Sequence, residues 1–253
     1  MSVQGGLDRL RHRARRPLAR TPYLWDLAML ARPSKRATLA RRNTAVVMEG
    51  FLRSGNTFSA AAFAVANGDD LHVGRHLHGA AHLLRARRLG VPAVALIRLP
   101  RDAVLSYLIR RDTITAEDAL TEYADFYRTA WRARPGFVVG LFDVVTRDFG
   151  SVIAAVNARF GTDFARYEPT PANERAAFAR VEEMNRLECG GLVVETHVGR
   201  PSAERHRRKD ELLATLDRPR AAALLRRAED LYLDYQELAV EQGVGPKTSP
   251  VTS

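Results

Sequence analysis

The sequence predicts an α/β protein of three layers, in which helices cover both faces of a central parallel sheet and a helical portion follows at the C-terminus. Three observations predict this class. Apolar runs of roughly four to eight residues alternate with helical segments between residues 44 and 160. The first run leads through a glycine-bounded loop into an alanine-rich helix. From residue 170 onward the pattern is helical throughout.

Each predicted element has its own signal. Strands are expected where apolar residues run together, at 44–48, 93–98 and 137–142, with a shorter candidate at 71–74. Pro100 and Asp102 suit the first turn of a helix, and Gly161 suits the end of one. The predicted helices are 57–66, 80–89, 101–111, 116–134, 151–160, 172–187, 203–216 and 220–242.

The chain has 253 residues, and we expect a single domain over residues 41–242. Residues 1–40 are rich in arginine and interrupted by prolines, which predicts a basic N-terminal arm, either solvated or in contact with an anionic surface. Residues 243–253 have the composition of a disordered tail. No apolar run reaches the roughly 18 residues of a transmembrane helix, and no signal peptide is recognisable, so we expect a cytoplasmic location.

The charge balance is strongly basic, with 39 Lys and Arg against 29 Asp and Glu. Nearly all of the positive charge is arginine, which suits bidentate binding of phosphate or sulfate but is equally explained by a biased overall composition. Aromatic residues make up 8% and do not interleave with the basic runs, so we expect no specific nucleic-acid partner. The single Cys189 excludes an intrachain disulfide.

The most informative stretch runs from residue 46 to residue 58, where a strand, a loop and a helix follow one another. Backbone N–H groups of such a loop, together with the helix N-terminus, form a cradle for a phosphate. The spacing Gly50-x4-Gly55-Asn56-Thr57 nearly matches the nucleotide-binding P-loop but lacks its Lys, and a cation stands earlier instead, at Arg53. The loop is therefore expected to bind a phosphate without hydrolysing a nucleoside triphosphate.

A second stretch places another cation at the end of a strand. Arg98 follows the apolar run 93–97, and Ser106 lies eight residues later, in the following helix. Ligands of open α/β sheets bind beyond the carboxyl ends of the strands. Arg98 and Ser106 are therefore expected to converge on one anion, although an arginine at a strand end and a surface serine need have no such role.

Together the two stretches resemble the sulfotransferase family that uses 3′-phosphoadenosine 5′-phosphosulfate. That family carries the pattern [KR]-S-G-[TN]-T-[WF] around the 5′-phosphosulfate, and the resemblance assigns this role to residues Arg53, Ser54, Gly55, Asn56, Thr57 and Phe58. It further implies that Arg98 and Ser106 hold the 3′-phosphate. Arg53 stands where many cytosolic members have Lys, as in many bacterial members, so a bacterial-type enzyme with a P-loop NTPase-like fold is implied.

Two weaker matches extend the resemblance over residues 44–216. Phe142-Asp143-Val144-Val145 is similar to a degenerate form of the Tyr-Glu-Asp-Leu stretch of the family. Residues 199–205 resemble a late basic loop that closes over the co-substrate, which adds Arg200 and Arg205 to the implied binding residues. The full pattern of that late loop is absent here.

Four of the seven histidines cluster at His72, His76, His78 and His82. Their spacing allows metal ligation, but no Cys or paired carboxylate joins them, so we expect no metal. The resemblance places a catalytic base in this stretch, at His76 or His78. A neutral imidazole, with its ordinary pKa of about 6.5, suits that role.

The implied function is transfer of a sulfuryl group from 3′-phosphoadenosine 5′-phosphosulfate to a hydroxyl group of a small-molecule, carbohydrate or lipid acceptor. Transfer proceeds by in-line displacement with a histidine base, and Arg53 acts electrostatically because an arginine does not give up its proton. Two alternatives stay open. One is an atypical P-loop nucleotide- or phosphate-binding protein or kinase-like enzyme without sulfuryl transfer, and the other is a binding module without catalysis.

Overall fold

The computed structural model describes residues 21–111, 113–188 and 203–245, without the side chains of 203–206. A four-stranded parallel sheet forms its centre, in the order β2-β1-β3-β4. Every residue of β1, β3 and β4 is buried, as the continuous apolar runs predict. The strands are β1 (Val46–Gly50), β2 (Val73–Arg75), β3 (Ala93–Ile97) and β4 (Val138–Leu141).

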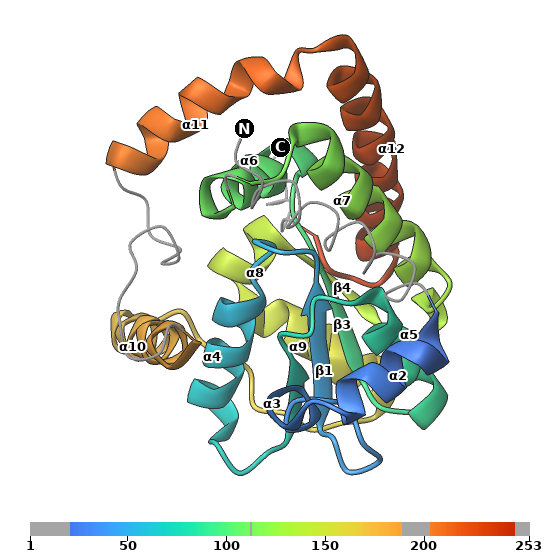
Figure 1. The fold of residues 1–253 in the computed structure, drawn as a ribbon. Helices are drawn as coiled ribbons and strands as arrows, with labels where there is room; N and C mark the ends of the chain where they lie inside the picture. The colour runs from blue at the N-terminus through green and yellow to red at the C-terminus, as the bar shows by residue number, and fades with distance from the viewer. Residues whose placement is uncertain (1–20, 112, 189–202, 246–253) are drawn as a thin grey trace, which may run out of the picture.

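Helices cover both faces of this sheet, which confirms the predicted three-layer α/β fold. One face carries α4 (Asn56–Asn67), α8 (Phe142–Arg147) and α9 (Phe149–Phe160). The opposite face carries α5 (Ala80–Leu89), α7 (Ala116–Trp131) and α12 (Pro219–Glu241). Figure 1 shows the two groups on opposite sides of β1, β3 and β4.

The remaining helices pack around these layers. α6 (Pro100–Arg110) leads from β3 to α7, and the 3₁₀ turn η1 (Arg134–Gly136) leads into β4. α10 (Pro171–Glu188) packs on α4, and α11 (Ala203–Leu216) packs on α6. Among the described residues no helix is both long enough and apolar enough to cross a bilayer.

The strand order places a topological switch point at β1. The chain moves from β1 outward to β2 and then returns past β1 to β3 on its other side. Crossovers of opposite direction open a crevice at the carboxyl ends of such neighbouring strands, where ligands of open α/β sheets bind. The loops that follow β1 and β3, which contain both sequence motifs, therefore meet at one edge of the sheet.

The packed part of the chain begins before residue 41, which corrects the predicted boundary of the N-terminal arm. α2 (Pro22–Leu30) and α3 (Pro33–Arg36) precede β1, and α2 packs against α5. The indole of Trp25 is buried with Met29 and Leu39 in a small apolar cluster. This packing could not be predicted from the sequence, because Gly79 and Ala81, which contact Trp25, lie far along the chain.

Two further boundaries differ from the prediction. Val244 is fully buried, and the Gln242 amide bonds the backbone of Phe137 and Val139, so the first residues of the predicted tail belong to the fold. The short helix α8 begins at Phe142, where a strand end was predicted. Asp148 separates α8 from α9 because its carboxylate accepts from the backbone N–H of Ser151 and caps the second helix.

Candidate active site

The loop between β1 and α4 is tightly constrained at both ends. A Cβ atom at Gly50 would lie 2.3 Å from the carbonyl oxygen of Leu96 on β3, so only glycine fits there. Gly55 caps α4 with φ 93°, a left-handed conformation that favours glycine. No side chain caps the described N-terminus of α4. The first N–H groups of the helix therefore point into the loop, as an anion site requires.

Arg53 connects the two sequence motifs. Its Nε donates a hydrogen bond of 3.0 Å to Oγ of Ser106 on α6. Nη1 of Arg98 in turn donates to the backbone carbonyl of Arg53 at 3.3 Å. Arg98 and Ser106 thus each contact Arg53, in the loop where the positive N-terminus of α4 also lies.

Aromatic side chains hold Arg98 at this edge of the sheet. Its guanidinium carbon lies 4.1 Å from the ring centroid of Phe142, the first residue of α8. The Tyr123 hydroxyl donates to the carbonyl of Arg98 at 2.8 Å. Phe142 also borders Gly55, where an added Cβ atom would lie 3.4 Å from the ring. Phe142 therefore contributes packing and a cation–π contact at the loop.

Two of the loop residues turn their side chains inward. The Ser54 hydroxyl is buried and lies 3.3 Å from the hydroxyl of Tyr127, which donates to the Leu96 carbonyl. Burial raises the pKa of Tyr127, which keeps this hydroxyl protonated as a donor. The Asn56 amide is buried and donates to the carbonyl of Phe51 at 3.0 Å. The Asn56 side chain therefore points inward, and the backbone N–H of Asn56 is the group that would face a phosphate.

The other implied binding residues are placed as follows. The Phe58 ring packs against Tyr167 and Phe178, between α4 and α10. Thr57 is half-buried in the first turn of α4. Arg200 lies outside the described residues, and Arg205 lies in α11 with a side chain outside the described part of the structure.

A buried carboxylate on β1 organises the histidine segment. Glu49 is fully buried, and it accepts the backbone N–H of Leu77 at 3.1 Å and that of His78 at 3.0 Å. It also lies 2.9 Å from Nδ1 of His82. Each carboxylate oxygen thus receives a hydrogen bond from the turn after β2. Sequence reasoning missed this residue, although an acid inside the apolar run Val46–Gly50 was a usable signal.

His82 and His72 have structural roles. Nε2 of His82 accepts a hydrogen bond from the backbone N–H of Ala40 at 3.0 Å. The ring proton is therefore on Nδ1, which donates a hydrogen bond to the Glu49 carboxylate. Nδ1 of His72 lies 2.8 Å from the Thr44 hydroxyl, and its Nε2 lies 2.9 Å from the Ala37 carbonyl oxygen. These two imidazoles connect the segment before β1 to β2 and α5.

His76 and His78 differ in their surroundings. Nδ1 of His76 accepts from Nη1 of Arg75 at 3.1 Å, which leaves the proton of a neutral ring on Nε2. His78 is partly exposed, and its Nδ1 lies 3.5 Å from the Gly50 carbonyl and 3.9 Å from Glu49. A carbonyl only accepts, so Nδ1 of His78 is the donor and Nε2 stays open as a proton acceptor.

The backbone at these positions is strained. Within the described residues the non-glycine positions with positive φ are Arg53 at 68°, His76 at 58° and His78 at 50°. They are the three residues that the sequence singled out as catalytic. Left-handed conformations cost about 1–3 kcal/mol and concentrate at functional sites, because the surrounding structure must hold them. For His76 and His78, Glu49 supplies part of that support.

Glu49→Gln is expected to lower the free energy of unfolding by about 1–3 kcal/mol, because one acceptor oxygen becomes an amide that faces buried donors. Denaturant unfolding of the variant measures this change. Glu237→Gln, at an exposed position of α12, is the matched control and should leave the midpoint unchanged. Equal midpoints for both variants would contradict the structural role of Glu49.

His76 makes stability depend on pH. Burial, followed by the neighbouring charges of His78, Arg75, Lys35 and Arg110, holds the pKa of His76 well below its usual value. The imidazole therefore binds a proton more readily in the unfolded chain than in the folded chain. The stability that the neutral His76 contributes is present above about pH 6.5 and is lost as the pH falls. His76→Asn keeps a residue that tolerates positive φ and should flatten the loss of stability between about pH 7 and 5. The assignment would be disproved if the urea midpoint of the variant changed with pH as steeply as that of wild type.

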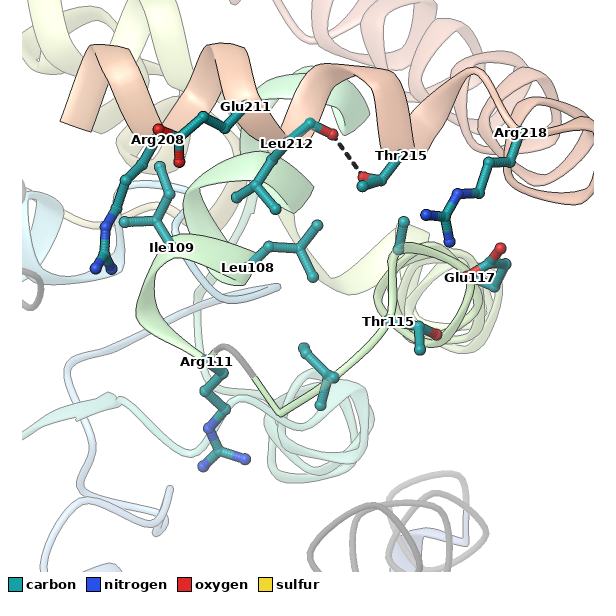
Figure 2. A pocket seen from close by; sticks show the side chains of 12 residues that line it. Leu108, Ile109, Arg111, Thr115, Glu117, Arg208, Glu211, Leu212, Thr215 and Arg218 are labelled. Carbon is teal, nitrogen blue, oxygen red and sulfur yellow. Dashed lines mark hydrogen bonds between the residues drawn. The ribbon is translucent and has the colours of Figure 1, made fainter. Parts of the chain in front are cut away.

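A separate cavity of about 380 Å³ lies between α6, the start of α7 and α11. None of its lining residues is a predicted site residue, and Figure 2 shows cationic and acidic side chains around it, among them Arg208, Glu211, Arg218 and Glu117. Three arginines and two glutamates are among its lining residues. Within the described chain no three His, Cys, Asp or Glu residues are grouped as metal ligands.

Comparison with known proteins adds a structural likeness. No family model and no curated protein matches this chain. A solved structure that it resembles is the crystal structure of mouse sulfotransferase SULT7A1 complexed with PAP, with 11% sequence identity and a TM-score of 0.39. The alignment covers 77% of this chain and 90% of that chain. A likeness this distant carries no functional conclusion, so the function of this chain rests on its own residues.

Proposed function

We propose that the protein is a sulfotransferase that moves the sulfuryl group of 3′-phosphoadenosine 5′-phosphosulfate to a hydroxyl group of an acceptor. The observation that carries this proposal is the meeting of the two motifs, in which Arg53 lies 3.0 Å from Ser106 and Arg98 donates to the Arg53 carbonyl. Two arginines, a hydroxyl and a helix N-terminus at one switch point suit a ligand with two separate phosphates.

Arg53 and the N-terminus of α4 are the groups that act on the 5′ end of the nucleotide. In the reaction the bond from sulfur to the bridging oxygen breaks, and the leaving adenosine bisphosphate gains negative charge. Arg53 and the backbone N–H groups at Asn56 and Thr57 stabilise that charge where it develops. Arg98 and Ser106 bind the 3′-phosphate, and the ring of Phe142 keeps the Arg98 guanidinium in place.

His78 is the proposed base. The acceptor oxygen forms the new bond to sulfur, and its proton passes to Nε2 of His78. The Nδ1 atom lies 3.5 Å from the Gly50 carbonyl, a contact that orients the ring and leaves Nε2 toward the acceptor. His76 is less suited, because Arg75 occupies its Nδ1 and burial withdraws the ring from solvent.

The kinase-like alternative is disfavoured at one position. A nucleoside triphosphatase P-loop has a Lys after its second glycine, and that Lys reaches the β- and γ-phosphates. Here the position is Asn56, whose short side chain is buried and bonded to Phe51. The loop therefore lacks the cation that triphosphate chemistry requires.

Arg98→Ala is expected to remove the preference for a 3′-phosphate. Adenosine 3′,5′-bisphosphate should bind about 1.5–3 kcal/mol more weakly, because a charged hydrogen bond is lost, and Ser106→Ala should cost about 1 kcal/mol. Adenosine 5′-phosphate should be affected far less. Calorimetric titration of both nucleotides measures the difference, with Arg101→Ala, at an exposed position of α6, as control. An unchanged ratio of the two affinities in both variants would refute the assignment.

A further inference from the structure

Helix α2 is apolar on two opposite sides, and the described residues of the chain cover only one of them. Its inner side buries Trp25 and Met29 against α5 and the segment before β1. Its outer side leaves four large apolar residues exposed, by 72%, 54%, 65% and 43%, at Tyr23, Leu24, Leu27 and Leu30. Spacings of one, three and four residues place them on one stripe of the helix. A contiguous stripe of this kind marks an interaction surface.

The stripe belongs to a firmly docked helix. Asp26 is buried and accepts from Arg85 at 3.0 Å and also from Arg88, both on α5. A Cβ atom at Gly79 would lie 2.6 Å from the Trp25 indole nitrogen, so the two backbones approach closely. The inner contacts therefore fix which side of α2 faces outward.

Basic residues are concentrated in the part of the sequence that contains this stripe. Residues 1–42 contain eleven Arg and Lys and two Asp, which accounts for most of the net charge of +10. One of those aspartates is the buried Asp26. Arg32, Lys35 and Arg36 follow the helix at exposed positions, and the guanidinium of Arg88 lies 4.7 Å from the Tyr23 ring.

We infer that the outer side of α2, with the basic residues around it, binds an anionic lipid surface. An interfacial helix inserts an apolar stripe at the boundary between headgroups and acyl chains, while Arg and Lys beside it attract anionic headgroups. Neither an apolar stripe nor basic side chains alone give firm attachment to a membrane, and α2 with the residues around it supplies both. A nucleic acid would use the charge and leave three leucines exposed, so lipid is the partner that matches both properties.

The inner side of α2 adjoins the turn that carries the proposed base. Trp25 contacts Gly79, the residue after His78, and Nζ of Lys35 donates to the His76 carbonyl at 3.4 Å. A protein docked through the outer side of α2 would hold this turn behind the helix, about one helix diameter (roughly 10 Å) from the lipid surface. The inference stands on the exposed stripe and the charge, so it does not depend on the proposed reaction.

Vesicle sedimentation with the full chain tests the inference. The probes are phosphatidylcholine vesicles with and without phosphatidylglycerol, at low and at physiological salt. Wild type should pellet with the anionic vesicles and be released as salt screens the charges. The double variant Leu24→Gln/Leu27→Gln should lower the partition coefficient on the order of tenfold or more, because two apolar side chains no longer enter the lipid.

Leu233→Gln on α12 is the matched control, because Leu233 is 54% exposed, as Leu24 is. It should bind vesicles as wild type does, and circular dichroism should show both variants folded. Wild type that stays in the supernatant with anionic vesicles at low salt would overturn the inference. Equal binding by the double variant would overturn the role of the stripe. Self-association that Leu24→Gln/Leu27→Gln abolishes, without lipid binding, would assign the stripe to a second copy of the chain.

Discussion

His78→Asn is expected to lower sulfuryl transfer by roughly 10²–10⁴, the usual contribution of a general base. Asn tolerates the left-handed conformation that residue 78 adopts with φ 50°, so the turn held by Glu49 should survive. The variant loses only the imidazole that would take the acceptor proton. Affinity for adenosine 3′,5′-bisphosphate should stay near the wild-type value, because Arg53, Arg98 and Ser106 are untouched. Turnover and nucleotide affinity, measured on the same preparation, separate the two effects.

His76→Asn is the matched control, because residue 76 has a similar φ of 58° and lies in the same turn. It should retain most of the transfer activity. A loss in His76→Asn with full activity in His78→Asn would exchange the two roles. Full activity of both variants between about pH 6 and 8 would place the base outside this turn.

Arg53→Gln is expected to lower turnover by about 10²–10³, the typical effect of removing one donor that stabilises developing charge. Gln keeps a long polar side chain at a position with φ 68° and removes the charge. Because Arg53 also bonds Ser106, affinity for the bisphosphate should fall as well, but by less than the turnover. Single-turnover kinetics with saturating co-substrate isolates the chemical step.

Arg101→Gln is the control for a general change in charge, since Arg101 is exposed on α6, close in sequence to Arg98. It should leave turnover unchanged. Near-normal turnover in Arg53→Gln would remove Arg53 from the reaction and leave it only a packing role beside Ser106.

The sheet and most helices follow from the sequence, because β3 and β4 are apolar runs buried on both faces and β1 is one apart from Glu49, while β2 is shorter and only partly buried. The helices at 80–89 and 203–216 match α5 and α11 residue for residue. The packing of α2 was not predictable, because Gly79 and Ala81, against which Trp25 packs, lie more than fifty residues further along the chain. α8 was missed because Phe142–Arg147 is one short helix directly after β4, and the cap at Asp148 is what separates it from α9.

The site was predictable at the level of segments and less so at the level of atoms. The rule that ligands bind at the carboxyl ends of parallel strands predicted that Arg98 and Ser106 converge on one anion, whereas the hydrogen bond of Arg53 to Ser106 was not predicted. The inward turn of Asn56 depends on the backbone angles of the loop, which a residue pattern does not contain. The hydrogen bonds of Glu49 join β1 to the turn after β2. The only sign of this long-range contact in the sequence is an acidic residue inside an apolar strand.

Calorimetric titration of the full chain with adenosine 3′,5′-bisphosphate, without added metal, tests the central claim most directly. The claim is that the loop after β1 and the Arg98–Ser106 pair form one site for a nucleotide with phosphates at both positions. The expected result is saturable binding at one site per chain, tighter than binding of adenosine 5′-phosphate and tighter than binding of ATP with Mg²⁺. Tighter binding of ATP with Mg²⁺, or no binding of the bisphosphate, would contradict it.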